Sequence, residues 1–219
     1  MKIIAEIKTD MKEKFGLPRQ SGLVPGLKGR IVFKKEYRDE NALRGLDGFS
    51  HIWVIWRFDG FDGESWSPTV RPPRLGGNKR IGVFATRSPN RPNPIGLSLL
   101  KLDKIEHGEL FVSGVDMRDG TAIYDIKPYL KITDCRPDAK DGFAEFTAQN
   151  SVKVVFECET DALSDEELET LTQTLEEDPH PSYKSESDRV YGMCFKGYNV
   201  NFKTDKETIT VLSIKNDEL

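Results

Sequence analysis

The sequence predicts a mainly β protein, in which an antiparallel-rich β-barrel domain is followed by a small α+β domain. Short runs rich in β-branched and aromatic residues recur along the first 150 residues, which is typical of strands. Gly- and Pro-rich loops separate these runs, and helical periodicity is scarce among them. Because strands and helices do not alternate regularly, a closed or nearly closed barrel is favoured over a doubly wound parallel sheet.

The composition is that of a soluble globular protein. The chain has 219 residues, of which 37% are hydrophobic and 31% charged, with a net charge of -4. This length allows one large core, or a domain of about 150 residues with a small second domain. No apolar run approaches the roughly 20 residues of a membrane span, and the N-terminal stretch MKIIAEIKTD lacks the features of a secretory signal. We therefore expect a cytoplasmic protein.

Six runs in the first 150 residues have the composition of strands. They begin near residues 3, 30, 50, 81, 95 and 109 and read IIAEI, RIVFK, SHIWVIWRF, IGVFA, IGLSLLKL and ELFVSGVD. Residues 38–46 are the best helix candidate here, because Ala42, Leu43 and Leu46 would share one face. The polar segments between the runs, including MRDGTAIYDIKPYL at 117–130, are expected to be loops that gather into a cleft.

The pattern changes after residue 150. The run VKVVFEC predicts a strand, and Ser164 with Glu167 forms a capping-box pattern before an amphipathic helix. The stretch DPHPSY ends this helix, and the runs VYGMCF, YNVNF and TITVLSI predict a three-stranded meander. We therefore expect a barrel domain over 1–150 and a small α+β domain over 151–219.

The stretch SPNRPNP at 88–94 is unusually rigid. Proline fixes φ near -65° and favours extended backbone in the residue before it, so Pro89, Pro92 and Pro94 hold the chain stiff. A flexible linker would use glycine and serine instead. We interpret this stretch as a binding loop that presents Arg87, Arg91 and Asn93 in fixed directions, in preference to a structural connector.

Charge is distributed unevenly along the chain. Residues 71–94 contain six cations and no acid, whereas residues 159–179 contain nine acids and no base. A basic surface on an otherwise acidic protein is compatible with nucleic-acid binding. The alternative for the basic run is scattered solubilising charge, and the acidic run is interpreted as a solvated helix face.

Several common active sites are absent from the sequence. It contains no GxGxxG motif after a strand, no P-loop, no GxSxG and no HExxH. The three cysteines, Cys135, Cys158 and Cys194, lack zinc-site spacing and are interpreted as buried free thiols, and the three histidines are too dispersed for a metal cluster. We expect no metal, and these patterns leave open a small-molecule-binding or a nucleic-acid-binding barrel.

The motifs PRQSGL, ALRGLDGFSHIW, SPTVRPPRLGGNKRIGVFATRSPNRPNPIGLSLL, DGTAIYDIKPYL and DPHPSY, in this order, resemble those of the TrmO, or TsaA-like, family. The resemblance covers nearly the whole chain. It implies an S-adenosyl-L-methionine-dependent methyltransferase that acts on N6 of threonylcarbamoyladenosine at position 37 of tRNA. It further implies a β-barrel catalytic domain, a homodimer with the cofactor near the subunit interface, and the C-terminal domain of the longer bacterial members.

The resemblance also implies which residues bind the cofactor. Glycines would allow close approach of the backbone, carboxylates would accept from the ammonium or ribose hydroxyl groups, and a guanidinium would meet the methionine carboxylate. The implied contacts are Gln20, Ser21, Gly22, Asp59, Gly60, Arg87, Leu99, Asp119, Gly120, Thr121 and Ala122.

The substrate side is interpreted on chemical grounds. Direct displacement at a sulfonium methyl group depends mainly on positioning, so Asn93 and Arg91 are expected to orient the target base, with Arg91 meeting the threonyl carboxylate. Further candidates for substrate binding are Arg71, Arg74, Arg80, Asp178 and Tyr183. No residue is assigned as a general base. The alternative is a non-catalytic barrel that senses the cofactor or binds RNA.

Overall fold

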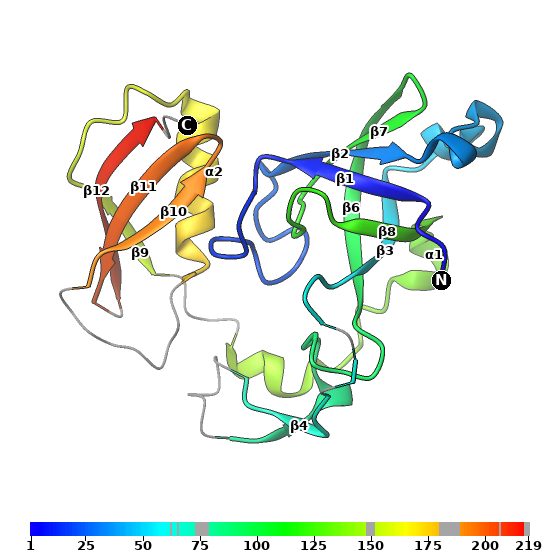
Figure 1. Ribbon diagram of the computed structural model, residues 1–219. Helices are drawn as coiled ribbons and strands as arrows, with labels where there is room; N and C mark the ends of the chain where they lie inside the picture. Colours follow the sequence, from blue (N-terminus) through cyan, green and yellow to red (C-terminus); the bar gives the residue numbers. More distant parts are fainter. Residues whose placement is uncertain are drawn as a thin grey trace.

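The computed structural model describes residues 1–61, 63–64, 66–72, 79–147, 152–179, 189–205 and 207–216. Its larger part is a closed six-stranded barrel with the order β1-β2-β7-β6-β3-β8, in which every neighbouring pair is antiparallel (Figure 1). The strands are β1 (Ala5–Thr9), β2 (Lys28–Phe33), β3 (His51–Arg57), β6 (Ile95–Glu106), β7 (Glu109–Ser113) and β8 (Ala122–Pro128). The predicted fold class is confirmed.

The barrel strands fill their interior through alternating side chains. In β3, Ile52, Val54 and Trp56 are buried while the residues between them are more exposed, which is the period of two that one buried strand face requires. Ile7 of β1 and Leu100 of β6 join the same hydrophobic core. The alternation of burial along these strands therefore follows from which face meets the core.

Two sequence expectations for the barrel domain were wrong, one in part. Residues 122–128, expected as loop, form β8 and close the barrel by pairing with both β1 and β3. The expected helix at 38–46 is replaced by two 3-10 turns, η2 (Glu40–Leu43) and η3 (Leu46–Gly48), because Gly45 adopts a left-handed φ of 84° between them.

The run near residue 81 contributes only a short strand. Strand β5 (Ile81–Gly82) pairs with β4 (Thr69–Val70) to form a two-stranded sheet outside the barrel. The 3-10 turn η5 (Val83–Ala85) follows directly and leads into the proline-rich loop. Three further short elements are η1 (Lys35–Tyr37), α1 (Lys131–Asp134) and η6 (Gly142–Thr147).

The C-terminal part is a four-stranded sheet with one long helix. The sheet has the order β10-β11-β12-β9, and its strands are β9 (Lys153–Phe156), β10 (Tyr191–Phe195), β11 (Tyr198–Thr204) and β12 (Thr208–Asn216). Helix α2 (Asp165–Glu176) begins with the predicted capping box between Ser164 and Glu167. The predicted meander is confirmed, and β9 adds to it as a parallel neighbour of β12. The proposed boundary near residue 150 falls at 148–151, outside the described residues.

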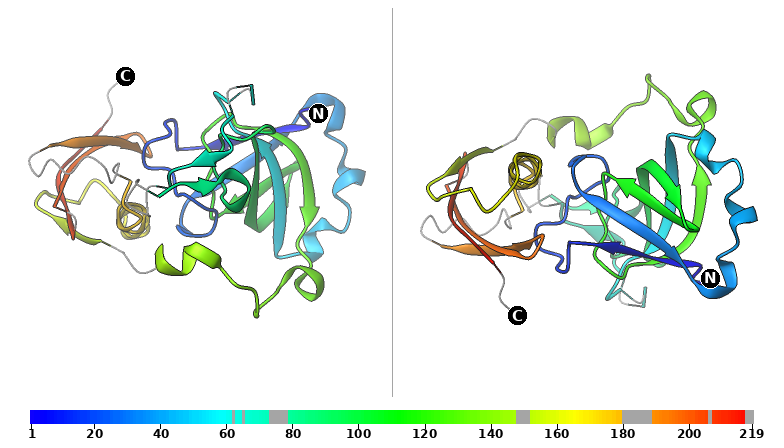
Figure 2. Two further views of the ribbon diagram at one scale, coloured as in Figure 1. Left: turned by 90° about the horizontal axis from the view of Figure 1, so that it is seen from below. Right: turned by 90° about the horizontal axis from the view of Figure 1, so that it is seen from above.

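The segment between β1 and β2 joins the two parts of the molecule. Met11, Val24 and Leu27 are buried in the same hydrophobic core as Leu171 of α2 and Phe202 of β11. Both views in Figure 2 place α2 between its sheet and the barrel, with the segment at 10–27 reaching toward it. The barrel domain therefore supplies part of the core on which the C-terminal sheet and helix pack.

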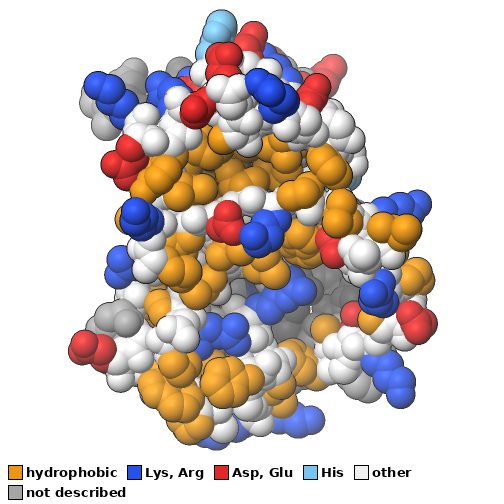
Figure 3. Space-filling view, turned by 90° about the vertical axis from the view of Figure 1, so that its right-hand side faces the viewer, with side chains coloured by type: hydrophobic (Ala, Val, Ile, Leu, Met, Phe, Trp, Pro, Cys, Tyr) orange, Lys and Arg blue, Asp and Glu red, His pale blue; other side chains and the backbone are white. Residues whose placement is uncertain are grey.

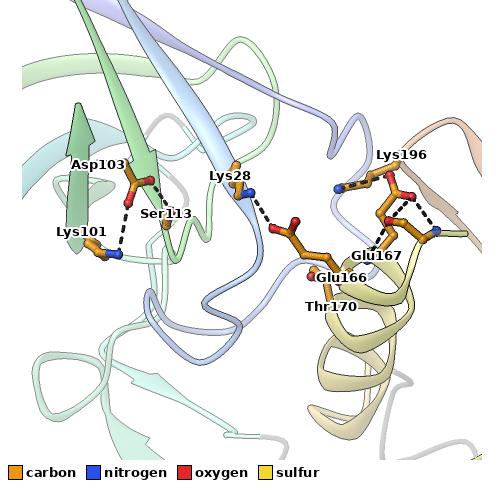
Figure 4. A network of polar contacts seen from close by, with 9 residues as sticks. Lys28, Lys101, Asp103, Ser113, Glu166, Glu167, Thr170 and Lys196 are labelled. Atoms are coloured by element: carbon orange, nitrogen blue, oxygen red, sulfur yellow. Dashed lines mark hydrogen bonds and ion pairs between the residues drawn. The ribbon is translucent and has the colours of Figure 1, made fainter. Parts of the chain in front are cut away.

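Close contacts fix this junction. A Cβ atom added to Gly26 would lie 2.0 Å from Oγ1 of Thr170, so only glycine fits against α2 at this point. Nζ of Lys28 lies 2.6 Å from Oε1 of Glu166, an ion pair that links β2 to the first turn of α2 (Figure 4). The hydrogen bond to Glu166 raises the pKa of Lys28, and the same contact lowers the pKa of Glu166.

The three cysteines are free thiols, as expected, but each is partly rather than fully buried. None of the helices that the structure describes is long and apolar enough to cross a membrane.

Candidate cofactor and substrate pocket

A pocket of about 640 Å³ lies where the β1–β2 segment, the end of β3, the proline-rich loop, the start of β6 and residues 116–121 meet. Its lining is mixed: Trp53, Trp56 and Leu97 supply apolar surface, whereas several arginines and carboxylates supply charge. A concave site of this size with few, convergent polar groups is typical of small-molecule binding. Loops far apart in the sequence thus gather as the sequence predicted.

The apolar side of the pocket is built around Trp56. Its ring lies 4.3 Å from that of Phe58, measured between centroids. Gly96, the partner of Trp56 in the β3–β6 register, lies beneath the indole, and a Cβ atom added there would lie 2.1 Å from ring atom Cε2. Glycine at this position therefore lets the indole lie flat on β6.

On the other side of the pocket, charged side chains form an ion pair and hydrogen bonds with neighbouring segments. Nη2 of Arg118 lies 3.0 Å from Oδ2 of Asp59, and Nζ of Lys14 donates to the Asp59 carbonyl oxygen at 2.8 Å. Nη1 of Arg87 donates to Oε1 of Gln20. These contacts join the β1–β2 segment, the 58–61 loop and the proline-rich loop around one space.

Arg91 is anchored to its own loop. Its Nη2 donates to the carbonyl oxygens of Val83 and Thr86 at 3.0 and 2.9 Å, while its Nε is buried without a partner among the described residues. The same loop packs closely on Gly63, since a Cβ atom added there would lie 2.2 Å from the Pro92 carbonyl oxygen. This loop also places Pro89 and Arg91 in the lining of the pocket.

Asp116 is a pocket carboxylate that sequence reasoning missed. Its Oδ1 accepts from the Ser98 hydroxyl at 2.6 Å, and the Ser98 oxygen accepts from Nε1 of Trp56 at 2.9 Å. Burial raises the pKa of Asp116 to about 6, against the opposing effects of the Ser98 hydrogen bond, the Ser21 backbone and the nearby charge of Arg87. The available signal was an acid directly after the buried run FVSGV, where a core residue would be expected.

The structure places the predicted cofactor residues in two groups. Gln20, Asp59, Arg87 and Thr121 line the pocket. Ser21, Gly22, Gly60, Leu99, Asp119, Gly120 and Ala122 lie in the segments around it.

The second group supports the first through backbone contacts. The backbone N–H of Leu99 donates to Oγ of Ser21 at 3.0 Å, which ties β6 to the β1–β2 segment. Oδ1 of Asp119 accepts from the Thr9 backbone at 3.1 Å, so this carboxylate is engaged with β1. The segments that carry both groups are thereby held together.

The predicted substrate residues are more dispersed. Arg91 lines the pocket, whereas Asn93 is exposed and its carbonyl oxygen accepts from the Ile95 N–H at 2.8 Å. Arg71 and Arg80 are exposed near the β4–β5 sheet, and the Asp178 carbonyl oxygen accepts from Nη2 of Arg19 at 2.8 Å. Arg74 and Tyr183 lie outside the described residues.

The face in Figure 3 carries patches of hydrophobic side chains, with Lys and Arg side chains beside Asp and Glu. This face is therefore not uniformly basic.

The donor set of the pocket suits a ligand that combines a cation, a carboxylate and an aromatic ring. Nε atoms of Arg91 and Arg118 are buried without hydrogen-bond partners among the described residues, so donors remain for an anionic group. The carboxylate of Asp59 suits a cationic group, and the indoles suit a flat ring. S-adenosylmethionine has all three features and fits these residues. Within the described ranges no cluster of His, Cys, Asp or Glu could hold a metal ion.

Several known proteins resemble this chain over most of its length. It is 38% identical over 225 residues to the tRNA (adenine(37)-N6)-methyltransferase of Escherichia coli, covering 97% of this chain and 96% of that protein. It is 46% identical over 162 residues to the protein of the same name from Eikenella corrodens, covering 72% of this chain and 92% of that one. A Pseudomonas aeruginosa relative, 38% identical over 87% of this chain and 86% of its own length, is named as a putative S-adenosylmethionine-dependent methyltransferase.

Solved structures show the same architecture. A crystal structure of TrmO matches with a TM-score of 0.79 at 30% identity, covering 97% of both chains. A structure of TrmO from Pseudomonas aeruginosa matches with a TM-score of 0.77, also at 30% identity, over 97% of each chain. The model of the tRNA-methyltransferase O N-terminal domain matches residues 6–135, and that of the TrmO C-terminal domain matches residues 147–217. With its barrel, its pocket and both of these domain matches, the chain belongs to the TrmO family.

Proposed function

We propose that this protein is an S-adenosylmethionine-dependent tRNA (adenine(37)-N6)-methyltransferase whose target is N6 of threonylcarbamoyladenosine. The observation that carries the proposal is a pocket with cationic, anionic and aromatic lining in the barrel part of a member of the TrmO family. Two of the relatives described above bear the name of this activity, and a third is named for the cofactor.

Different residues of the pocket would bind the cofactor and the target nucleoside. S-adenosylmethionine supplies a methyl group on a positively charged sulfur when it is bound. Gln20, Asp59, Arg87 and Thr121 would hold it, supported by the glycines and backbone groups of the adjoining segments. Because Arg87 and Gln20 contact each other across two loops, binding at either one would order both.

On the substrate side we propose that Arg91 meets the carboxylate of the threonylcarbamoyl group. Its Nε is buried and unpaired among the described residues, and its Nη2 contacts hold the side chain in one direction, which limits the entropy lost on binding. Asn93 would help to orient the target base. The further residues that would bind the tRNA are Arg71, Arg74, Arg80, Asp178 and Tyr183. We also propose that the protein is cytoplasmic and that it forms a homodimer. Light scattering at micromolar concentration measures the oligomeric state directly.

Transfer of a labelled methyl group to tRNA tests the function. The wild-type protein is incubated with methyl-labelled S-adenosylmethionine and with anticodon stem-loops that carry either threonylcarbamoyladenosine or plain adenosine at position 37. We expect label on the modified stem-loop, and a preference over the plain one that falls about tenfold or more in Arg91→Ala, as loss of a charge-assisted contact implies.

Arg44→Ala is the matched control, because it removes the same charge from an exposed 3-10 turn outside the pocket. If Arg91→Ala weakens both stem-loops equally, Arg91 contacts phosphate and does not read the threonyl group. Cofactor binding without any transfer to either stem-loop would instead favour a non-catalytic cofactor-binding barrel.

A further inference from the structure

The proposed function leaves one pocket carboxylate without a role. Asp116 follows β7 in the chain and faces the pocket together with the aromatic side chain of Trp56 and the buried Met117. Loss of the N6 proton during methyl transfer requires an acceptor, and none has been assigned above. The following inference concerns that acceptor and rests on the proposed function.

The Asp116 carboxylate is held in a fixed orientation. The Ser98 hydroxyl, fully buried on β6, donates to Oδ1 at 2.6 Å. Ser98 is itself oriented by the Trp56 indole N–H at 2.9 Å, and Trp56 lies flat because Gly96 leaves room for it. This chain of contacts from β3 through β6 holds the carboxylate without neutralising its charge.

The charged groups around Asp116 leave it available to a ligand. Arg118 forms an ion pair with Asp59, Arg87 donates to Gln20, and Arg91 donates to its own loop. Lys14 and Arg19 also line the pocket, but Lys14 donates to the Asp59 carbonyl oxygen and Arg19 to that of Asp178. No salt bridge to Asp116 is present among the described residues.

Desolvation makes this carboxylate a stronger base than an exposed one. Burial raises the pKa of Asp116 to about 6, so the group is ionised at neutral pH and binds a proton more readily than an ordinary aspartate does. A general base works best when its pKa lies close to the working pH. Asp59, in the same pocket, differs in that Arg118 pairs with its carboxylate.

We propose that Asp116 is the proton acceptor for N6 of the target nucleoside. As the N6 lone pair forms the new N–C bond to the methyl carbon, the S–C bond breaks and its electron pair returns to sulfur. The N6–H bond breaks, its electron pair stays on N6, and its proton passes to the carboxylate of Asp116. One positive and one negative charge disappear together, which favours the step in a pocket with apolar walls.

Asp116→Asn tests this role and keeps the size of the side chain and its ability to accept from Ser98. Asp103→Asn is the matched control, because Asp103 lies on β6 and accepts from Ser113 in a similar Ser–Asp pair outside the pocket (Figure 4). We expect Asp116→Asn to slow single-turnover methyl transfer at least 100-fold, while the cofactor dissociation constant from calorimetry stays within about threefold of wild type. Asp103→Asn should change neither quantity more than threefold.

The pH profile supplies a second readout. The wild-type rate should rise with pH and level off above about 6, because the base must be ionised, and this inflection should vanish in Asp116→Asn. Ser98→Ala removes a hydrogen bond that lowers the pKa of Asp116, so it should move the inflection upward. This profile remains informative even if Asp116→Asn folds poorly.

Two outcomes overturn the inference. If Asp116→Asn weakens cofactor binding more than tenfold but transfers methyl at the wild-type rate when saturated, Asp116 binds the cofactor and is no base. The inference is also overturned if the wild-type profile has no inflection near pH 6, or if Ser98→Ala does not move that inflection. Failure of the wild-type protein to methylate any tRNA refutes the proposed function instead, so the two failures are distinguishable.

Discussion

Asp116 illustrates how one side chain can serve the site and lower the stability of the fold. Its pKa is raised to about 6 from the ordinary 3.8, so the folded chain holds a proton between these values that the unfolded chain has released. Above about pH 6 the ionised carboxylate therefore lowers the free energy of unfolding by its full amount. Below about pH 4 this effect is absent.

We therefore expect Asp116→Asn to be more stable than wild type at pH 7, by about 1 kcal/mol once partial exposure is allowed for. Differential scanning calorimetry should show a melting temperature higher by roughly 2–4 °C at pH 7. The difference should shrink as the pH falls from 6 to 4. A variant that is less stable at every pH would mean that the carboxylate has a net stabilising partner.

At the residue scale the sequence predicted polar pocket members better than apolar ones. Gln20, Asp59, Arg87 and Thr121 lie in loops whose polar composition and family motif were visible in the sequence. Trp56 was not distinguishable from a core residue, because it is buried in a strand and faces the pocket only through the packing of Gly96. Asp116 was missed because a strand register, which one sequence does not reveal, brings Ser98 beside it.

At the element scale, the barrel strands whose runs are rich in β-branched and aromatic residues were predicted, whereas β8 was not. Strand β8 contains Asp125 and Lys127, which made its segment read as a loop, yet it pairs with both β1 and β3. Pairing on both edges of β8 accommodates these two charged residues within the strand. The helix expected at 38–46 fails for a local reason, the left-handed Gly45.

The β1–β2 segment carries the predicted residues Gln20 and Ser21 and packs against α2 through Gly26. A methyl group at Gly26 would meet Thr170, which the helix holds through a hydrogen bond to the Glu166 carbonyl oxygen. We expect Gly26→Ala to lower the free energy of unfolding by about 1–3 kcal/mol and to weaken cofactor binding, because the segment is displaced.

Urea denaturation and calorimetry measure the two effects of Gly26→Ala. The double variant Gly26→Ala with Thr170→Ala should recover part of both losses, since the clashing Oγ1 is removed. Gly48→Ala is the control, because a Cβ atom there meets nothing within 4 Å. Equal stability of Gly26→Ala and Gly48→Ala would show that the junction accommodates the added methyl group without a loss in the free energy of unfolding.

On the scale of the whole molecule, the barrel and the C-terminal part share a core instead of meeting at a polar interface. Met11, Val24 and Leu27 lie in the cluster built around α2 and its sheet. Unfolding either part exposes apolar surface of the other, so the two should unfold together. This coupling could not be predicted from a boundary drawn on composition alone.

The positions of the tryptophans make this testable. All three, Trp53, Trp56 and Trp66, belong to the barrel part, so tryptophan fluorescence reports on it, whereas far-UV circular dichroism also reports on α2 and its sheet. We expect the urea transitions from both probes to coincide within error. A separate early transition in circular dichroism alone would show that the C-terminal part unfolds independently.

The shared core also has a consequence for synthesis on the ribosome. Met11, Val24 and Leu27 are made early, but the strands that cover them, β10 to β12, end at residue 216. At translation rates of about 5–20 residues per second, these side chains wait on the order of ten seconds for their partners. The β1–β2 segment, which carries Gln20 and Ser21 at the pocket, is thus fixed in place last. A nascent or prematurely terminated chain would leave this wall unsupported and its apolar side chains open to chaperones.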